Sequence, residues 1–236
     1  MKKIPGDYQY KALHRGNPIQ RRWHKAKIDL LSRVAPPMAG ARVLDAACGS
    51  GVISEYLNSR GAEVMAVDTN KDCITFAQRQ FQKKGLTFLC KSIFDINGHL
   101  FDTIYCLEAI EHFPQNELLP LLNHFKGILK PGGRLFLTTP NYASPWPIIE
   151  WCLDTFGLVP KLKGDQHVSR LTPNGLGSLL TRGGWHILEM GTFNGLAPFC
   201  AIVSHRLSDW LFRRELKHRT RLCRNLIYVL AEPLKE

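Results

Sequence analysis

A turn of small residues, D-A-A-C-G-S-G at positions 45–51, follows the apolar run Val43-Leu44 and is the sharpest chemical signal in the sequence. Its glycines let a backbone approach a ligand closely, through angles that other residues resist. Asp68 ends the next apolar run, and a carboxylate at that place accepts both hydroxyls of a ribose. Ser54 stands where a nicotinamide-binding G-x-G-x-x-G turn needs its third glycine. The pair therefore favours a nucleoside cofactor of another class, and the alternative is a tight turn without a ligand.

Glu108, Glu111 and His112 place two carboxylates and one imidazole in a single short segment. Residues three apart share a face of a helical turn, so the two carboxylates can act together. The set suits Mg²⁺ or a similar hard ion, although histidine is an unusual magnesium ligand. The alternative is that Glu111 caps a helix and His112 supports the cofactor site.

His167, in the segment Gly164-Asp-Gln-His167, is the second candidate catalytic group. A histidine at the carboxyl edge of a sheet can accept a proton from a substrate hydroxyl. A histidine in a surface loop is the equal alternative. The sequence thus predicts His167, His112 and Glu111 as catalytic residues, with Glu108, Glu111 and His112 as metal ligands.

The elements that must position these residues alternate between strand and helix patterns. Alternation at these lengths predicts a doubly wound, mostly parallel seven-stranded sheet covered by helices on both faces. Helices are expected at 19–34, 52–60, 71–84, 118–129 and 173–182, and strands at 42–45, 63–68, 86–90, 101–107, 134–139, 185–190 and 225–230. Residues 1–18 show no regular pattern. We expect residues 1–40 to form a helical segment over the cofactor site and residues 41–236 to form the main domain.

Two insertions interrupt this alternation, at 142–170 and 197–222. Trp146 to Val159 is too apolar for an ordinary surface loop and follows the fifth strand. Phe199 to Arg221 is amphipathic and basic. An aromatic and aliphatic segment beside a basic helix fits peripheral contact with an anionic membrane. A lid packed on the sheet is an equally good interpretation of the apolar insertion.

Charge and composition narrow the class of partner. The 236 residues carry a formal net charge of +11, which favours anionic partners such as nucleic acid, anionic lipid or an acidic substrate. Seven cysteines, none in a C-x-x-C pair, indicate neither a disulfide framework nor a zinc site. The first residues lack the apolar core of a signal peptide, and no stretch has the length of a membrane span. A cytoplasmic protein, peripheral to the membrane at most, is expected.

The turn and the segments after it resemble class I S-adenosylmethionine-dependent methyltransferases. D-A-A-C-G-S-G is similar to their D-x-G-x-G-x-G signature, with Ala47 in place of the first glycine. Further segments resemble that family in the same order along the chain: D-T-N at 68–70, S-I-F-D at 92–95, F-D-T-I-Y-C-L-E at 101–108 and L-K-P-G-G at 129–133. The resemblance implies S-adenosylmethionine as cofactor. It places the cofactor contacts at Asp45, Ala47, Gly49, Gly51, Asp68, Thr69, Asn70, Ser92, Ile93 and Leu107.

Three other segments resemble the ubiquinone-biosynthesis O-methyltransferases. They are L-H-R-G-N-P at 13–18, E-A-I-E-H at 108–112 and V-P-K at 159–161. The resemblance implies methylation of catechol-type hydroxyls on polyprenylated rings, and it associates the Glu-x-x-Glu-His set with a divalent ion.

The sequence therefore predicts methyl transfer from S-adenosylmethionine to an oxygen of a small or lipid-like acceptor, such as a prenylated catechol or quinol. A nucleic-acid methyltransferase using the basic surface is the first alternative, although no Asn/Asp-Pro-Pro-aromatic motif follows the fourth strand. The second is a non-catalytic, membrane-associated module that keeps a nucleotide fold.

Overall fold

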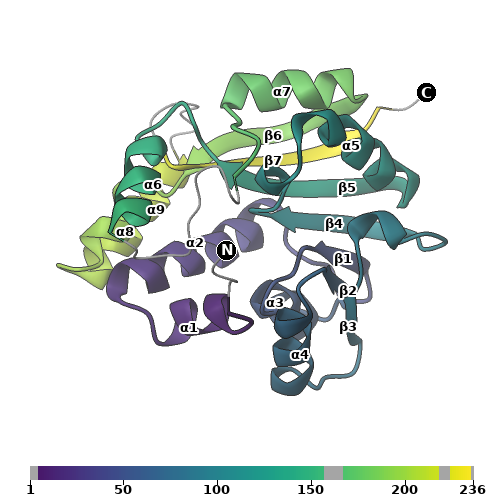
Figure 1. Cartoon of the computed structure of the whole chain (residues 1–236), viewed down its shortest axis with the longest axis horizontal. Coiled ribbons are helices and arrows are strands. Elements are labelled where there is room, and N and C mark those ends of the chain that lie inside the picture. Colours follow the sequence, from purple (N-terminus) through teal and green to yellow (C-terminus); the bar gives the residue numbers. More distant parts are fainter. Residues whose placement is uncertain (1–4, 157–166, 218–223, 235–236) are drawn as a thin grey trace.

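The structure is a computed structural model that describes residues 5–156, 167–217 and 224–234. Within these residues one seven-stranded sheet has the order β3-β2-β1-β4-β5-β7-β6 (Figure 1). Strands β1 to β5 pair in parallel, while β7 pairs antiparallel with β5 and β6. The prediction of a mostly parallel, seven-stranded, doubly wound sheet is confirmed. The strands are β1 Arg42–Ala46, β2 Glu63–Asp68, β3 Leu86–Cys90, β4 Phe101–Leu107, β5 Leu129–Pro140, β6 Trp185–Phe193 and β7 Leu226–Pro233.

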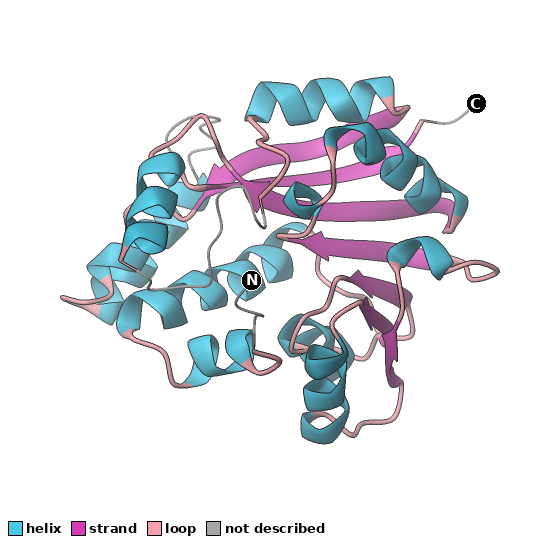
Figure 2. Ribbon diagram, in the orientation of Figure 1, coloured by secondary structure: helices cyan, strands magenta, loops and turns pink. Residues whose placement is uncertain are grey.

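Helices flank the sheet and also gather at one end of it (Figure 2). Helices α1, α2, α6, α8 and α9 lie beyond the end of the sheet toward which the β4 arrow points (Figure 1). The described helices are α1 Tyr8–His14, α2 Pro18–Val34, α3 Val52–Ser59, α4 Lys71–Gln80, α5 Leu118–Gly127, α6 Trp146–Thr155, α7 Pro173–Arg182, α8 Ala197–Cys200 and α9 His205–Lys217, with short 3-10 turns at η1 Ile93–Asp95, η2 Ile110–His112 and η3 Gln115–Glu117. Residues on the loops at this end are therefore enclosed by helices.

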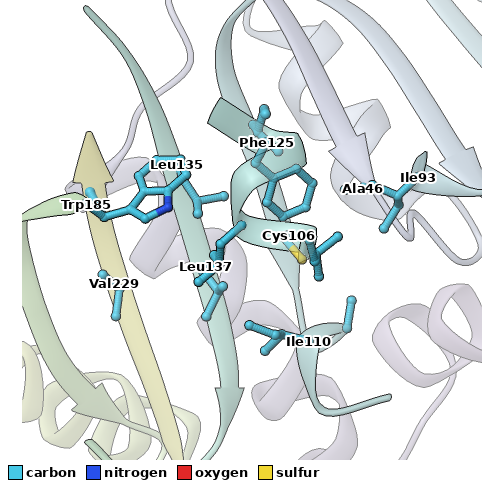
Figure 3. Packing of buried hydrophobic residues seen from close by; sticks show 14 of the residues in the cluster. Ala46, Ile93, Cys106, Ile110, Phe125, Leu135, Leu137, Trp185 and Val229 are labelled. Carbon is cyan, nitrogen blue, oxygen red and sulfur yellow. The ribbon is translucent and has the colours of Figure 1, made fainter. Parts of the chain in front are cut away.

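Both faces of the sheet are buried, as the apolar strands predict. Neighbouring residues alternate between two hydrophobic clusters: Leu44 and Ile104 belong to one, whereas Val43 and Tyr105 belong to the other. Figure 3 shows the first cluster, where Phe125 of α5 and Leu137 of β5 pack among the residues around Cys106. The rigid sheet between two cores fixes the loops at its edge.

Three local predictions differ from the structure. Residues 8–14 form α1, where no regular structure is expected from the sequence; α1 is short and packs against α2. The predicted helix 71–84 ends at Gln80. The fifth strand begins at Leu129, five residues before the expected start, and carries a register shift opposite 101–103. Tertiary contacts decide short helices and strand ends, so local patterns place them poorly.

No helix among the described residues combines the length and the apolar character needed to cross a lipid bilayer.

Candidate functional site

The turn between β1 and α3 holds three residues in the left-handed backbone region. Their φ angles are 62° at Ala47, 52° at Gly49 and 79° at Gly51. Glycine adopts such angles freely, whereas alanine pays a steric penalty, which explains why related turns carry glycine at the position of Ala47. The turn therefore has the open, glycine-dependent shape that the sequence predicts.

Asp68 joins this turn to the end of β2. Its Oδ2 accepts the Gly49 N–H at 2.8 Å, and its Oδ1 accepts the Asn70 N–H at 2.8 Å. Asp68 is half-buried, so its carboxylate is fixed in place at the edge of the sheet while part of it stays accessible. Thr69, next to it, is exposed, and the Asn70 side chain caps α4.

Asp45 lies beneath the turn. It is 2% exposed and accepts a hydrogen bond of 2.6 Å from the Ser54 hydroxyl of α3. Burial raises the pKa of Asp45 to about 7, and the nearby charge of Asp68 also raises it. Asp45 therefore ties the turn to α3 from below.

Helix α1 lies against the same turn. Gln9 Oε1 accepts the Ser50 N–H at 3.1 Å, and the Tyr10 N–H donates to the Ser50 hydroxyl at 3.0 Å. A Cβ at Gly49 would lie 2.3 Å from Gln9 Oε1, the end of a flexible side chain that would then have to move. Helix α1 thus contacts the turn through Gln9 and Tyr10, and Gln9 itself carries no signal in the sequence.

The remaining predicted cofactor contacts lie on neighbouring strand ends. The Ser92 hydroxyl accepts the Phe94 N–H at 3.3 Å and thereby caps η1, while Ile93 is 6% and Leu107 8% exposed. Because β1, β2, β3 and β4 run parallel, all these residues meet at the same edge as the turn.

Glu108 follows β4 directly and has a φ of 50°, an unusual angle for this residue type. Its Oε2 forms an ion pair of 2.7 Å with Nζ of Lys27 on α2, and Lys27 is 5% exposed. Glu108 Oε1 is buried and finds no hydrogen-bond partner among the described residues. Lys27 lies in a run of basic residues between Arg15 and Lys27, yet it is buried and pairs internally.

Glu111 is 1% exposed, and its Oε2 accepts a hydrogen bond of 3.0 Å from Thr139 at the end of β5. Burial raises the pKa of Glu111 to about 8. At neutral pH this carboxyl is therefore largely protonated.

Glu111, His112 and His167 offer ligand atoms that all lie within 4.8 Å of one another. The backbone brings them together, since the N–H groups of Val168 and Ser169 both donate to the Glu111 carbonyl at 3.0 Å. The predicted metal set is Glu108, Glu111 and His112. Among the described residues, the group that gathers contains His167 in addition to Glu111 and His112, while Oε2 of Glu108 is paired with Lys27.

His167 is 7% exposed and its Nδ1 lies 2.6 Å from Oε1 of Glu150 on α6. The Tyr142 hydroxyl donates to the same Glu150 oxygen at 2.8 Å. Burial, with a smaller contribution from His112, lowers the pKa of His167, so the imidazole is neutral at pH 7. Sequence reasoning missed Glu150; its signal was an acid inside the apolar insertion.

Aromatic rings surround His167. Its ring centroid is 5.4 Å from that of His112 and 6.2 Å from that of Trp146, and Trp146 lies 5.5 Å from Trp23 of α2. The first part of the apolar insertion is thus packed beside the site, with Trp146 7% exposed. The V-P-K match at 159–161 lies outside the described residues.

Solved structures share this fold. Magnesium protoporphyrin IX methyltransferase from Synechocystis, with bound S-adenosylhomocysteine, superposes with a TM-score of 0.62 at 18% identity, over 91% of this chain and 87% of that chain. The sheet, with its left-handed turn after β1 and an acid at the end of β2, has the Rossmann-like fold of S-adenosylmethionine-dependent methyltransferases.

The family follows from sequence comparison. Residues 19–190 match the family described as methyltransferase domain, and the chain belongs to this family. A ubiquinone biosynthesis O-methyltransferase of Xylella fastidiosa is 34% identical over 170 residues, which are 70% of this chain and 61% of that protein. The protein of the same name from Xanthomonas euvesicatoria is 30% identical over 174 residues, 72% of this chain and 64% of that protein. The chain thus matches less than two thirds of the length of these relatives.

Proposed function

We propose that this protein transfers a methyl group from S-adenosylmethionine to an oxygen of a small or lipid-like acceptor. The observation that carries the proposal is the meeting of two groups of residues at one sheet edge. One is the left-handed turn with Asp68, and the other is the cluster of Glu111, His112 and His167, in which Glu111 and His167 are buried and His112 is exposed.

The residues present fit the cofactor. The carboxylate of Asp68 would accept the ribose hydroxyls, the turn at 47–51 would face the methionine part, and Ser92, Ile93 and Leu107 would line the adenosyl side. The Gln9 amide lies over Gly49, so we expect its side chain to rearrange around the ligand. When bound, S-adenosylmethionine supplies an electrophilic methyl group on a sulfonium centre.

The residues of this chain then have three tasks: to align the acceptor oxygen with that methyl group, to exclude water, and to remove the hydroxyl proton. His167 is the base, because it is neutral and buried. It takes the proton of the acceptor hydroxyl while the oxygen forms its bond to the methyl carbon and the carbon–sulfur bond breaks. The products are a methyl ether, S-adenosylhomocysteine and a protonated His167. Glu111 and His112 hold the acceptor side of the site.

The acceptor is expected to be aromatic. The rings of His112 in η2 and Trp146 in α6 lie beside the His167 base, Trp23 of α2 lies against Trp146, and aromatic rings favour stacking against a planar ligand. Both relatives are named for ubiquinone biosynthesis, which supports a prenylated catechol or quinol.

A divalent ion is a separate question. The group of Glu111, His112 and His167 offers two imidazoles and one carboxyl, a set that suits Zn²⁺ or Mn²⁺ better than Mg²⁺, which prefers oxygen ligands. The fit to Mg²⁺ is therefore poor, and the proposed chemistry uses no step through a metal.

Peripheral contact with an anionic membrane would serve such a lipid-like acceptor. Helix α6 exposes Ile148 and Trp151, and the segment around α8 and α9 exposes Leu196, Ile202, Val203 and Trp210. Arg206, Arg213, Arg214 and Lys217 of α9 are also exposed. Apolar side chains flanked by cations are the surface that inserts into anionic lipid.

Four measurements test the proposal. Mass spectrometry of ligands that co-purify with the protein should find S-adenosylmethionine or S-adenosylhomocysteine, and labelled methyl transfer to a catechol should be lost in His167→Ala with cofactor affinity kept. Flotation with phosphatidylglycerol vesicles should recover the protein, and neutral vesicles should not. If the protein does not float with vesicles but shifts RNA in a salt-dependent gel assay, the nucleic-acid methyltransferase is favoured. If the protein floats with vesicles but binds no S-adenosylmethionine, the non-catalytic membrane-associated module is favoured.

A further inference from the structure

Glu150 is a buried carboxylate with an unusual position inside an apolar helix. It is 2% exposed, on the same helix whose neighbouring side chains Ile148 and Trp151 face outward. Burying a carboxylate is costly unless hydrogen bonds compensate it. Two groups supply hydrogen bonds to Oε1 of Glu150: the His167 ring at 2.6 Å and the Tyr142 hydroxyl at 2.8 Å.

These two contacts together decide where the His167 proton lies. An ionised Glu150 only accepts hydrogen bonds, so at 2.6 Å the facing Nδ1 must carry a hydrogen. The Tyr142 hydroxyl keeps its own proton, because burial and the bond to Glu150 raise the pKa of Tyr142. Tyr142 therefore donates its hydrogen to Glu150. Its hydroxyl oxygen lies 3.2 Å from Nδ1 of His167, but a neutral hydroxyl is a weaker acceptor for the Nδ1 hydrogen than the Glu150 carboxylate. In a neutral imidazole the lone pair then lies on Nε2.

The segment after the ring is anchored separately. Val168 and Ser169 bond to the Glu111 carbonyl, and the Ser169 hydroxyl donates to the Phe113 carbonyl at 2.7 Å. These bonds fix the main chain beside η2, but they leave the imidazole free to rotate. Glu150 of α6 contacts the ring itself, and this contact sets the orientation of the ring.

We propose that Glu150, supported by Tyr142, is a positioning residue that holds His167 as the Nδ1–H tautomer and presents Nε2 to the methyl acceptor. The use of Nε2 as the base rests on the proposed function. The assignment of the Nδ1–H tautomer does not depend on that function. A carboxylate in this place also stabilises the protonated ring that forms when His167 takes a proton, as in other carboxylate–histidine pairs.

The first test is spectroscopic and needs no acceptor. In ¹⁵N-labelled protein at neutral pH, the His167 ring, identified by the signal that His167→Gln removes, should show a protonated Nδ1 and a lone pair on Nε2. Glu150→Ala should shift the ring toward the Nε2–H tautomer or to an exchanging mixture. Glu150→Gln should keep part of the original signal, because an amide oxygen also accepts from Nδ1–H. A protonated Nε2 in the unaltered protein would overturn the proposal.

The second test separates positioning from folding. Glu150→Ala should lower kcat for a catechol acceptor about 10- to 100-fold and leave the KM for S-adenosylmethionine within about twofold, with Glu150→Gln intermediate. Asp154→Asn, an acid-to-amide change one turn further along α6, is the matched control and should change neither. Full kcat in Glu150→Ala with a folded protein would refute the positioning role. An unaltered protein that methylates no acceptor would refute the proposed function, while the ring spectrum would still decide the tautomer.

Discussion

Lys27 Nζ lies 2.7 Å from Oε2 of Glu108, so an α2 side chain that is 5% exposed neutralises the acid at the end of β4. Helix α2 is thereby held over the sheet edge by an ion pair whose lysine is buried and whose glutamate side chain is 22% exposed. The pair links the N-terminal segment to the strand end beside the proposed methyl-transfer site, and it removes Glu108 from the neighbouring donor group.

Breaking this pair should destabilise the protein. Lys27→Met leaves Glu108 without a counter-ion, and its Oε1 has no partner among the described residues. We expect a loss of about 2 kcal/mol in the free energy of unfolding, below the roughly 3–5 kcal/mol for a fully buried pair because the Glu108 side chain is 22% exposed. Urea denaturation measures it. Lys25→Met, an exposed change on the same helix, is the control. In Lys27→Met/Glu108→Gln much of the loss should be recovered; strictly additive losses would show that the two charges do not interact.

Asp68 should govern cofactor affinity. Asp68→Ala removes the expected ribose acceptor and also leaves the Gly49 and Asn70 N–H groups without their shared partner. We expect affinity for S-adenosylmethionine to fall at least about 10-fold by calorimetry, since a hydrogen bond to a charged group contributes about 1.5–3 kcal/mol. Asp72→Ala, an exposed acid at the start of α4, should bind as the unaltered protein does. Equal affinity in both variants would exclude the ribose role.

Ala47→Gly should stabilise the protein slightly. At a φ of 62° alanine carries strain that glycine does not, and the relief of about 1–2 kcal/mol is partly offset by the greater entropy of glycine in the unfolded chain. A net gain of up to about 1 kcal/mol, measured as a higher melting temperature, is expected. Ala46→Gly, in the fully buried end of β1, should instead lower it. A destabilised Ala47→Gly would show that the methyl group packs usefully in the turn.

The stability of the protein without ligand should depend on pH through Asp45. Burial raises the pKa of Asp45 from 3.8 to about 7, so the folded protein holds this proton more tightly than the unfolded chain. The stabilisation is fully present below pH 3.8 and is lost as pH rises through about 7. Relative to Asp45→Asn, the unaltered protein should therefore lose stability across this range. Parallel stability–pH curves for the two proteins would contradict the assignment.

Metal preference should follow the donor set. Two imidazoles and one carboxyl favour Zn²⁺ or Mn²⁺, so either ion should raise the melting temperature more than Mg²⁺ does at equal concentration. His112→Ala should abolish the difference in melting temperature between these ions and Mg²⁺. Excess chelator should reverse the increase in melting temperature. A larger shift with Mg²⁺ would point back to a carboxylate site that includes Glu108.

The sequence by itself determined the class of fold and the turn. Strands and helices follow from local apolar periodicity, and the bend at 47–51 follows from small residues whose backbone angles are a local property. Parallel strands end at one edge, so the meeting of Asp68 with this turn was also predictable.

Only the tertiary structure decided which side chains pair across the site. Lys27 reaches Glu108 across 81 residues of sequence, Gln9 reaches Ser50 across 41, and Glu150 meets His167 through the packing of α6. A lysine in a basic run and an acid in an apolar helix have the same local pattern whether they are solvated or paired. Their partners are set by how helices pack at the sheet edge, and burial then sets their charge states, because removal from water penalises an unpaired charge.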